Sequence, residues 1–318
     1  MPEWLIERGI GETRYALVED GEIVEARIAI EGATPAGTVL TARLADRGTD
    51  GRNAVATDER GTEYLLPRGA PGTSEGGALH IEVTREAIPG AEPWKRPLAR
   101  LTEQAPRDSP PLGGTELPFP APADALGQAG WNDLLDEARS GIVRFAAGEL
   151  RIFPTPAMTL IDVDGHLPPH ELAVGGAGEA ARAIRRLDIG GSIGIDLPTA
   201  GSKTARQESA AAVDAILPQP FERTAVNGFG FVQIVRPRFR ASLIELAQDR
   251  TAFEARALLR RAAFEAPGAK RIVAHPAVIA LLDPRSDWLG ALARQLGGVV
   301  ELRGDAALPI SGGYAEPL

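Results

Sequence analysis

Residues 159–198 read TLIDVDGHLPPHELAVGGAGEAARAIRRLDIGGSIGIDLP and contain two short apolar runs, each with aspartate near its end. The runs TLIDVD and SIGIDLP have the nearly continuous apolar character of buried strands. Between them, GEAARAIRRLD places its Ala and Ile residues at helical spacing, and Gly190 and Gly191 end the helix. A strand, a helix and a strand in so short a stretch predict a βαβ unit with two parallel strands.

The two strands place Asp162 and Asp196 near their carboxyl ends, where open α/β sheets bind ligands. Neighbouring strands lie about 4.8 Å apart, so carboxylates at equal heights can hold one cation between them. Asp164 follows Asp162 by two residues and shares its strand face. Oxygen ligands favour Mg²⁺ or Mn²⁺ over zinc. The sequence predicts a divalent-metal site, and the alternative is that these Asp residues only cap the following turns.

Three nearby motifs are weaker. Residues 190–194 match Gly-x-Ser-x-Gly, but they lie at a helix-to-strand turn, whereas a nucleophilic serine needs a strand-to-helix turn. Residues 201–204, GSKT, have Ser where a phosphate-binding loop has Gly before the Lys, and we interpret them as a polar loop. His166 and His170 are separated by two prolines, so they either line the mouth of the acidic site or are ordinary loop residues.

The parts of the chain before this unit suggest β structure followed by a linker. Residues 4–30 alternate apolar and polar residues around Asp20 and Gly21, which predicts a β-hairpin. Residues 37–102 contain short β-branched runs separated by turn residues, which predict a small barrel of the oligonucleotide-binding type. Residues 103–127 are rich in Pro and Gly and predict a linker.

Helices are predicted at 131–139 and 205–217, and the last seventy or so residues alternate helix and strand patterns typical of a small α/β domain.

Composition excludes several classes of protein. The chain has 318 residues, a formal net charge of −9 and no cysteine, which removes disulfides, thiolate catalysis and Cys-based zinc sites. No apolar stretch approaches the roughly 20 residues of a membrane span, and the first residues are charged rather than signal-like, so we expect a cytoplasmic protein without a membrane partner.

One segment departs from the acidic balance. Residues 234–271 contain nine basic residues and four acidic ones. An acidic body with one basic stretch suits contact with a polyanion at one place. The alternative is a pair of helices with solvated charged faces.

The runs TLIDVDGH, EAARAIRRLDIGGSIGIDLP and NGFGFVQIVRPRFRASL follow one another in the order and spacing of the catalytic core of the ribonuclease E/G family, which this chain resembles. LIERGIGETRYALVEDGEIVEARI is similar to the opening of that family, and RTAFEARALLRRAAFEAPGAKRIVAHPAVIALL to its small terminal domain. The resemblance implies an α/β multidomain fold with a ribonuclease H-like and DNase I-like core, an inserted OB-type β-barrel and a small α/β C-terminal domain. The implied boundaries are 1–34 with 104–155 (ribonuclease H-like part with linker), 35–103 (barrel), 156–245 (DNase I-like part) and 246–318.

The implied activity is Mg²⁺-dependent hydrolysis of single-stranded, A/U-rich RNA in rRNA maturation or mRNA decay, giving 5′-phosphate and 3′-hydroxyl ends; Mn²⁺ is a possible substitute, and no zinc is expected. Asp162 and Asp196 match the two metal-binding carboxylates of the family. Asp164 stands where the family pattern has an Asn that orients the attacking group, so all three aspartates are predicted catalytic residues.

The resemblance also implies an RNA-binding set. Arg236 and Arg238 would approach the RNA backbone, and their alternative role is that of exposed cations at a strand end. Tyr64 matches one aromatic of a base-stacking platform, or is a half-buried strand residue, and Lys95 matches a basic residue beside it. A second aromatic is replaced by Val55, which would weaken stacking by roughly 1–3 kcal/mol per base.

Three departures from the family pattern limit what can be carried over. The cysteine pair of the zinc link is absent, so we expect a monomer or dimer instead of the family tetramer. The region that senses a 5′-monophosphate is largely missing. The loop GHLPPHELAVGG at 165–176 lacks the usual arginines. The alternatives are therefore an RNA-binding protein without catalysis and a metal-dependent nuclease acting on DNA or another phosphodiester.

Overall fold

The computed structural model describes residues 2–89 and 95–318, and the chain is an α/β protein with an inserted closed β-barrel. Its contacts form two compact units. The first contains Met1–Glu31, Gly114–Ser140 and Leu246–Leu318; the second contains Gly32–Gly113 and Gly141–Glu245. The four-part division implied by the family resemblance stays a prediction.

The first unit has two sheets and most of its helices in the C-terminal segment. One sheet has the order β3-β2-β1-β9 and the other the order β17-β16-β18. The strands are β1 (Glu3–Arg8), β2 (Glu12–Glu19), β3 (Glu22–Ile30), β9 (Thr115–Leu117), β16 (Lys270–Ala274), β17 (Val300–Gly304) and β18 (Tyr314–Pro317). The helices are α1 (Ala125–Gln128), α2 (Trp131–Ser140), α6 (Arg250–Ala263), α7 (Pro276–Leu282) and α8 (Ser286–Leu296); α5 (Leu243–Gln248) crosses the boundary between the units.

The hairpin predicted around Asp20 and Gly21 is confirmed. Strands β2 and β3 pair antiparallel, and both turn residues have positive φ, 53° and 87°. Two consecutive left-handed residues match the right-handed twist of the strands that they join, and Asp-Gly tolerates this conformation.

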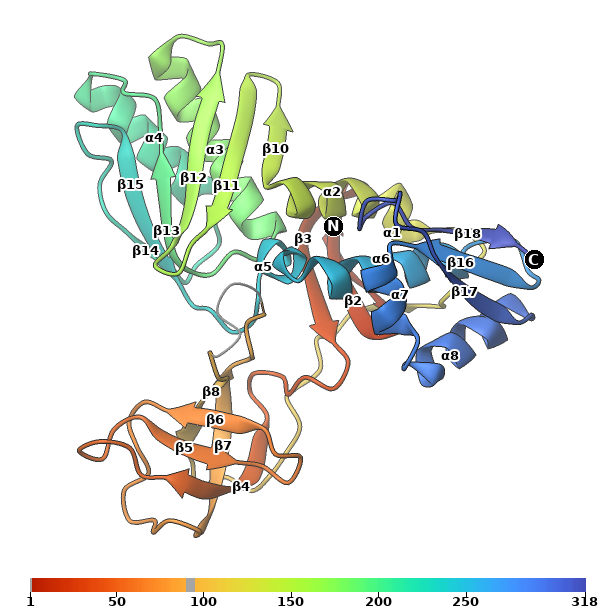
Figure 1. Ribbon diagram of the computed structural model, residues 1–318. Helices are drawn as coiled ribbons and strands as arrows, with labels where there is room; N and C mark the ends of the chain where they lie inside the picture. The colour runs from red at the N-terminus through yellow and green to blue at the C-terminus, as the bar shows by residue number, and fades with distance from the viewer. Residues whose placement is uncertain (1, 90–94) are drawn as a thin grey trace. The chain divides into compact units, whose positions relative to one another are not determined.

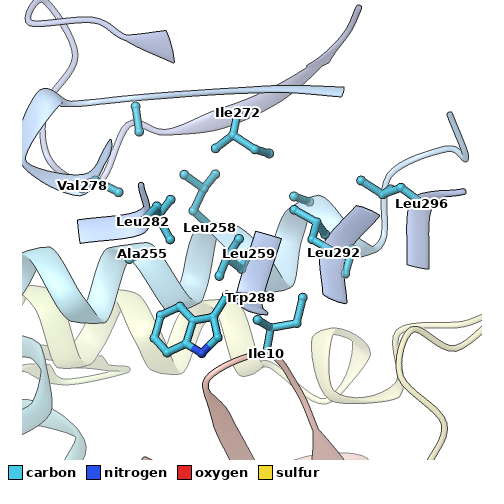
Figure 2. Close-up of a cluster of buried hydrophobic side chains, with 13 residues drawn as sticks. Ile10, Ala255, Leu258, Leu259, Ile272, Val278, Leu282, Trp288, Leu292 and Leu296 are labelled. Atoms are coloured by element: carbon cyan, nitrogen blue, oxygen red, sulfur yellow. The ribbon is translucent and has the colours of Figure 1, made fainter. Parts of the chain in front are cut away.

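A hydrophobic cluster holds the C-terminal helices of the first unit against its small sheet (Figure 2). Its members come from α6, α7, α8, β16 and the loop after β1, and they include Ile10, Leu258, Ile272, Leu282 and Trp288. The Trp288 Nε1–H donates to Glu31 Oε2 at 2.9 Å, so the polar atom of this buried ring has a partner.

The second unit contains a closed five-stranded barrel in the order β4-β5-β6-β8-β7. Its strands are β4 (Val39–Asp46), β5 (Ala54–Thr57), β6 (Glu63–Leu66), β7 (Ala78–Arg85) and β8 (Leu98–Leu101). Alternate residues point inward, as a half-buried strand requires, and small Ala side chains fill the interior together with Leu44, Tyr64, Leu66 and Ile81.

The second unit also contains a six-stranded sheet in the order β10-β11-β12-β13-β15-β14, with α3 and α4 on one face (Figure 1). Its elements are β10 (Ile142–Phe145), β11 (Gly148–Pro154), β12 (Thr159–Gly165), α3 (Pro169–Arg186), β13 (Gly191–Asp196), α4 (Lys203–Ile216), β14 (Glu222–Arg223) and β15 (Phe231–Arg236). Strands β12 and β13 pair in parallel, which confirms the βαβ prediction.

One local prediction needs correction, and one strand was not predicted. The predicted linker at 103–127 contains regular structure, because Thr115–Leu117 adds β9 in parallel to β1 and Ala125–Gln128 forms α1. Strand β18 at the C-terminus has no counterpart in the predictions. Pairing with strands distant in the sequence stabilises both strands, and no local apolar pattern signals it.

Candidate active site

A row of side chains crosses the sheet of the second unit on the face opposite α3 and α4. The register pairs Arg151 of β11 with Asp162 of β12, Asp162 with Asp196 of β13, and Asp196 with Phe231 of β15. Paired residues of neighbouring strands point to the same face, so these four side chains lie side by side. The predicted neighbourhood of Asp162 and Asp196 is therefore present in the structure.

This face is open enough for a ligand to reach the carboxylates. Asp196 is exposed and Asp162 is half-buried. Phe153, Leu160 and Val235 on the same face are 53%, 38% and 51% exposed, whereas Ile161 and Ile193, which point toward the helices, are fully buried. The sheet therefore has one packed face and one face available to a partner.

Asp164 extends the acidic group by one step along β12. It is exposed, lies on the same face as Asp162, and pairs in register with Glu149 of β11. The Arg151 Nη2 lies 2.7 Å from Glu149 Oε1, so this guanidinium already has a carboxylate partner beside the row. Negative charge is thus concentrated at the carboxyl ends of β12 and β13.

The pKa of Asp162 reflects this concentration of negative charge. Partial burial, followed by the charges of Asp164 and Asp196, raises the pKa of the Asp162 carboxyl, and Arg151 offsets only part of the effect. Each neighbouring carboxylate makes ionisation of Asp162 more costly. A cation bound between the carboxylates would relieve that repulsion.

The donor set fits one kind of metal site. Among the described residues, no group of three or more His, Asp or Glu side chains is placed to hold a metal ion. Mg²⁺, however, usually keeps several waters and takes one or two protein carboxylates together with substrate phosphate oxygens. The pair Asp162 and Asp196 fits Mg²⁺ held jointly with a phosphate ligand, and a closed site built from protein ligands alone does not fit.

Arg236 and Arg238 do not lie at this site. Along β13, Gly191 faces Arg236 whereas Asp196 faces Phe231, so Arg236 is about 16 Å from the acidic row at roughly 3.3 Å per residue. Its Nη1 donates to the carbonyl oxygen of Ile189 at 2.8 Å.

Arg238 forms an ion pair with Glu245. Both guanidinium groups bond other groups of the protein. Their predicted contact with the RNA backbone stays a prediction. Strand direction explains the distance of Arg236 from the acidic row, since β15 runs antiparallel to β13 and carries Arg236 away from Asp196.

Tyr64 lies inside the barrel. Its ring is fully buried, and its hydroxyl lies 2.9 Å from Thr34 Oγ1 and 3.1 Å from Asp58 Oδ2. A buried ring offers no face to a base, so the stacking role predicted for Tyr64 is wrong. The half-buried alternative also understates its burial.

Two outward positions of β5 and β6 near Tyr64 are aliphatic. Val55 and Leu65 face each other in register and are half-buried. Across 32–89 and 95–113, the described part of the barrel segment, Tyr64 is the one Phe, Tyr or Trp. Lys95 precedes β8 and is half-buried; its predicted RNA contact stays a prediction.

Most basic side chains of residues 234–271 pair with other groups of the protein. Arg256, Arg260 and Lys270 are buried, at 6%, 2% and 5% exposure. Arg240 Nη1 lies 3.1 Å from Asp188 Oδ2. The excess of basic residues in this segment therefore does not form a basic surface.

Two residues that the sequence interpretation missed lie in, or are bonded to, the segment that follows Asp196. Lys203 begins α4, shortly after Asp196; it is exposed, and the described part of the chain shows no ion pair or hydrogen bond for its side chain. Phe229 precedes Phe231 and is 82% exposed. GSKT was interpreted only as a polar loop; for Phe229, the available signal is an aromatic residue between two glycines.

The two histidines are loop and helix residues beside the site. His170 Nε2 lies 2.6 Å from Glu208 Oε2, an exposed pair that joins α3 to α4. The backbone N–H of His166 donates to the Ala147 carbonyl at 3.1 Å.

Comparison of the sequence with protein-family models finds no matching family, and comparison with curated proteins finds no significant match. In the described residues, no helix has both the length and the apolar character needed to cross a membrane.

Proposed function

We propose that this protein is a Mg²⁺-dependent endoribonuclease that hydrolyses single-stranded RNA on the open face of its six-stranded sheet. The pairing of Asp162 with Asp196 on adjacent parallel strands, with Asp164 beside them, is the observation that carries the proposal. The choice of RNA over DNA rests on the resemblance to the ribonuclease E/G family. In that scheme the six-stranded sheet is the DNase I-like part, the barrel is of the oligonucleotide-binding type, and the β3-β2-β1-β9 sheet belongs to the ribonuclease H-like part.

Each residue of the acidic group has a role in this proposal. Asp162 and Asp196 would hold Mg²⁺, and Asp164 would accept a hydrogen bond from the attacking water. When bound, Mg²⁺ polarises a phosphate and lowers the pKa of a water molecule. Lys203 would offset the charge of a neighbouring phosphate, the role that the sequence had assigned to Arg236 and Arg238. Hydrolysis would leave 5′-phosphate and 3′-hydroxyl ends.

The second candidate is an RNA-binding protein without catalysis. It is favoured by the absence of a three-ligand metal group among the described residues and by the loop at 165–176, which lacks arginine. A catalytic protein needs its carboxylates to bind metal, whereas a binding protein does not. Metal dependence therefore separates the two candidates.

The test is cleavage of a labelled, A/U-rich single-stranded RNA in Mg²⁺ and in EDTA, with a matched DNA oligonucleotide in parallel. We expect cleavage by the wild-type protein in Mg²⁺ only, and a loss of at least about 100-fold in rate for Asp196→Asn. Glu222→Gln is the control, because it removes one exposed carboxylate from the edge strand of the same sheet.

RNA that is shifted on a gel but cut by neither protein would replace the nuclease with the binding protein. Equal cleavage of DNA would remove the RNA assignment and leave a metal-dependent phosphodiesterase. Substrates with 5′-monophosphate and 5′-hydroxyl ends, compared in the same assay, measure whether end sensing is retained.

A further inference from the structure

Phe229 is a large apolar side chain held in solvent. It is 82% exposed, more than any other large hydrophobic residue among the described residues. Burying such a ring gains free energy in proportion to the apolar area removed from water. Single exposed apolar side chains are common on protein surfaces. The loop must therefore show whether the structure holds the ring in this position.

The loop around Phe229 is fixed by hydrogen bonds. The Asn227 Oδ1 accepts from the backbone N–H groups of Phe229 and Phe231, at 2.9 and 3.1 Å. The Gly230 N–H donates to the Asn227 carbonyl at 3.2 Å, and Gly230 has φ +94°. Buried Val226 anchors the preceding residues. The ring is therefore presented by an ordered turn.

The same turn is attached to the residues that follow Asp196. The Leu197 N–H donates to the Gly230 carbonyl at 3.2 Å, and the Thr199 hydroxyl donates to the Phe229 carbonyl at 3.1 Å. A Cβ atom on residue 230 would lie 2.2 Å from the Leu197 carbonyl oxygen, so only glycine permits this approach. The position of Phe229 is thus coupled directly to the strand end that carries Asp196.

The surroundings favour a nucleobase as the partner of this ring. An exposed aromatic beside phosphate-binding groups is the arrangement by which proteins hold single-stranded nucleic acid, since every base has a face on which a ring can stack. The described part of the barrel segment has no exposed Phe, Tyr or Trp, because Tyr64 is buried. Phe229, whose turn bonds the residues that follow Asp196, supplies a stacking surface that the described part of the barrel segment does not supply.

We propose that Phe229 stacks on a base of the single-stranded RNA whose phosphate lies at Asp162 and Asp196. Phe229 is then a positioning residue that sets which phosphate is presented to the carboxylates. This inference rests on the proposed function and adds to it the contact that orients the substrate.

The experiment measures binding with oligonucleotides in which one base at a time is replaced by an abasic site. Phe229→Ala should weaken binding of the intact RNA by about 5-fold to 150-fold, which corresponds to about 1–3 kcal/mol per stacked base. On the oligonucleotide that lacks the stacked base, wild type and Phe229→Ala should bind equally. Phe229→Trp should retain binding, and 2-aminopurine at the stacked position should be quenched by the wild type and not by Phe229→Ala.

Phe239→Ala is the matched control, because Phe239 is 53% exposed and follows the end of β15 remote from Asp196. Phe229→Ala could weaken binding of the intact and the abasic RNA equally, or weaken neither, while the wild type still binds and cuts RNA. That result would overturn the stacking proposal and leave the nuclease proposal standing. RNA neither bound nor cut by the wild type overturns both. If Phe229→Ala changes the sedimentation coefficient of the protein and leaves RNA binding unchanged, stacking is overturned and the ring belongs to a contact between two copies of the chain.

Discussion

Asp162 illustrates how a group of neighbouring carboxylates costs stability. Its pKa is raised by partial burial and by Asp164 and Asp196. The folded chain therefore favours the protonated carboxyl. The stabilisation of the folded state by this protonated form is fully present below the pKa of an unfolded Asp, about 3.9. It is lost as the pH rises through the raised folded-state pKa. At neutral pH the ionised side chain opposes folding.

We therefore expect Asp162→Asn to be more stable than the wild type at pH 7 by roughly 0.2–1 kcal/mol, the scale of partly exposed charge interactions. The difference should vanish at about pH 3, below both pKa values. Urea unfolding at the two pH values measures it, with Glu222→Gln as the control for loss of one carboxylate. Added Mg²⁺ should stabilise the wild type and not Asp162→Asn. Lower stability of Asp162→Asn at pH 7 would contradict this account.

At the scale of the elements, helix α3 approaches the sheet through glycine. A Cβ atom on residue 176 would lie 2.3 Å from the Val163 Cγ1 of β12, whereas one on residue 175 would meet nothing within 4 Å. The two adjacent glycines therefore have opposite roles. Gly176 permits close packing behind the strand that carries Asp162, while Gly175 only makes the helix more flexible.

This contrast predicts opposite effects for the same substitution. Gly175→Ala should stabilise the protein by about 0.5–1 kcal/mol, because alanine restricts the unfolded chain and favours helix. Gly176→Ala should destabilise it by about 1–3 kcal/mol, because Val163 or the helix must move. Thermal unfolding of the two variants at equal concentration checks both signs. Equal effects of the two substitutions would show that α3 does not pack as described.

At the scale of the whole molecule, a buried charge network joins three distant parts of the chain into the first unit. Glu7 Oε1 accepts from Arg14 Nη1 at 2.7 Å and from Arg260 Nε at 2.9 Å, and all three residues are at most 2% exposed. Arg260 also bonds Asp124, the N-cap of α1. Glu12 extends the network to Arg256. The network links β1 and β2 with α1 and α6.

Removing one member should leave an uncompensated buried charge. We expect Arg260→Met to lower the free energy of unfolding by about 3–5 kcal/mol, with little dependence on salt. Arg8→Met removes one partner of the Arg8–Glu116 pair, whose side chains are both 61% exposed, and should cost less than about 1 kcal/mol. Urea unfolding at low and high ionic strength compares the two. A small effect of Arg260→Met would mean that water or Arg14 replaces its charge.

The features that could be predicted from the sequence are those encoded within short segments. Strand-like apolar runs ending in Asp162 and Asp196, a helix between them and an Asp-Gly turn each depend on neighbours a few residues away. The parallel pair of strands and the hairpin followed from these local signals. Because parallel strands must align their carboxyl ends, the meeting of the two aspartates was predictable as well.

The tertiary structure alone decided which side chains face solvent and which meet across the chain. Tyr64 is inside the barrel, Arg236 lies at the far end of β15, and the turn that carries Phe229 bonds the residues that follow Asp196. Each placement depends on contacts with distant segments that the local pattern does not specify. Arg260 finds Glu7 at a separation of 253 residues. A charge or ring in a sequence shows only what it can bind, and the pairing of distant segments determines whether it is buried, paired or available.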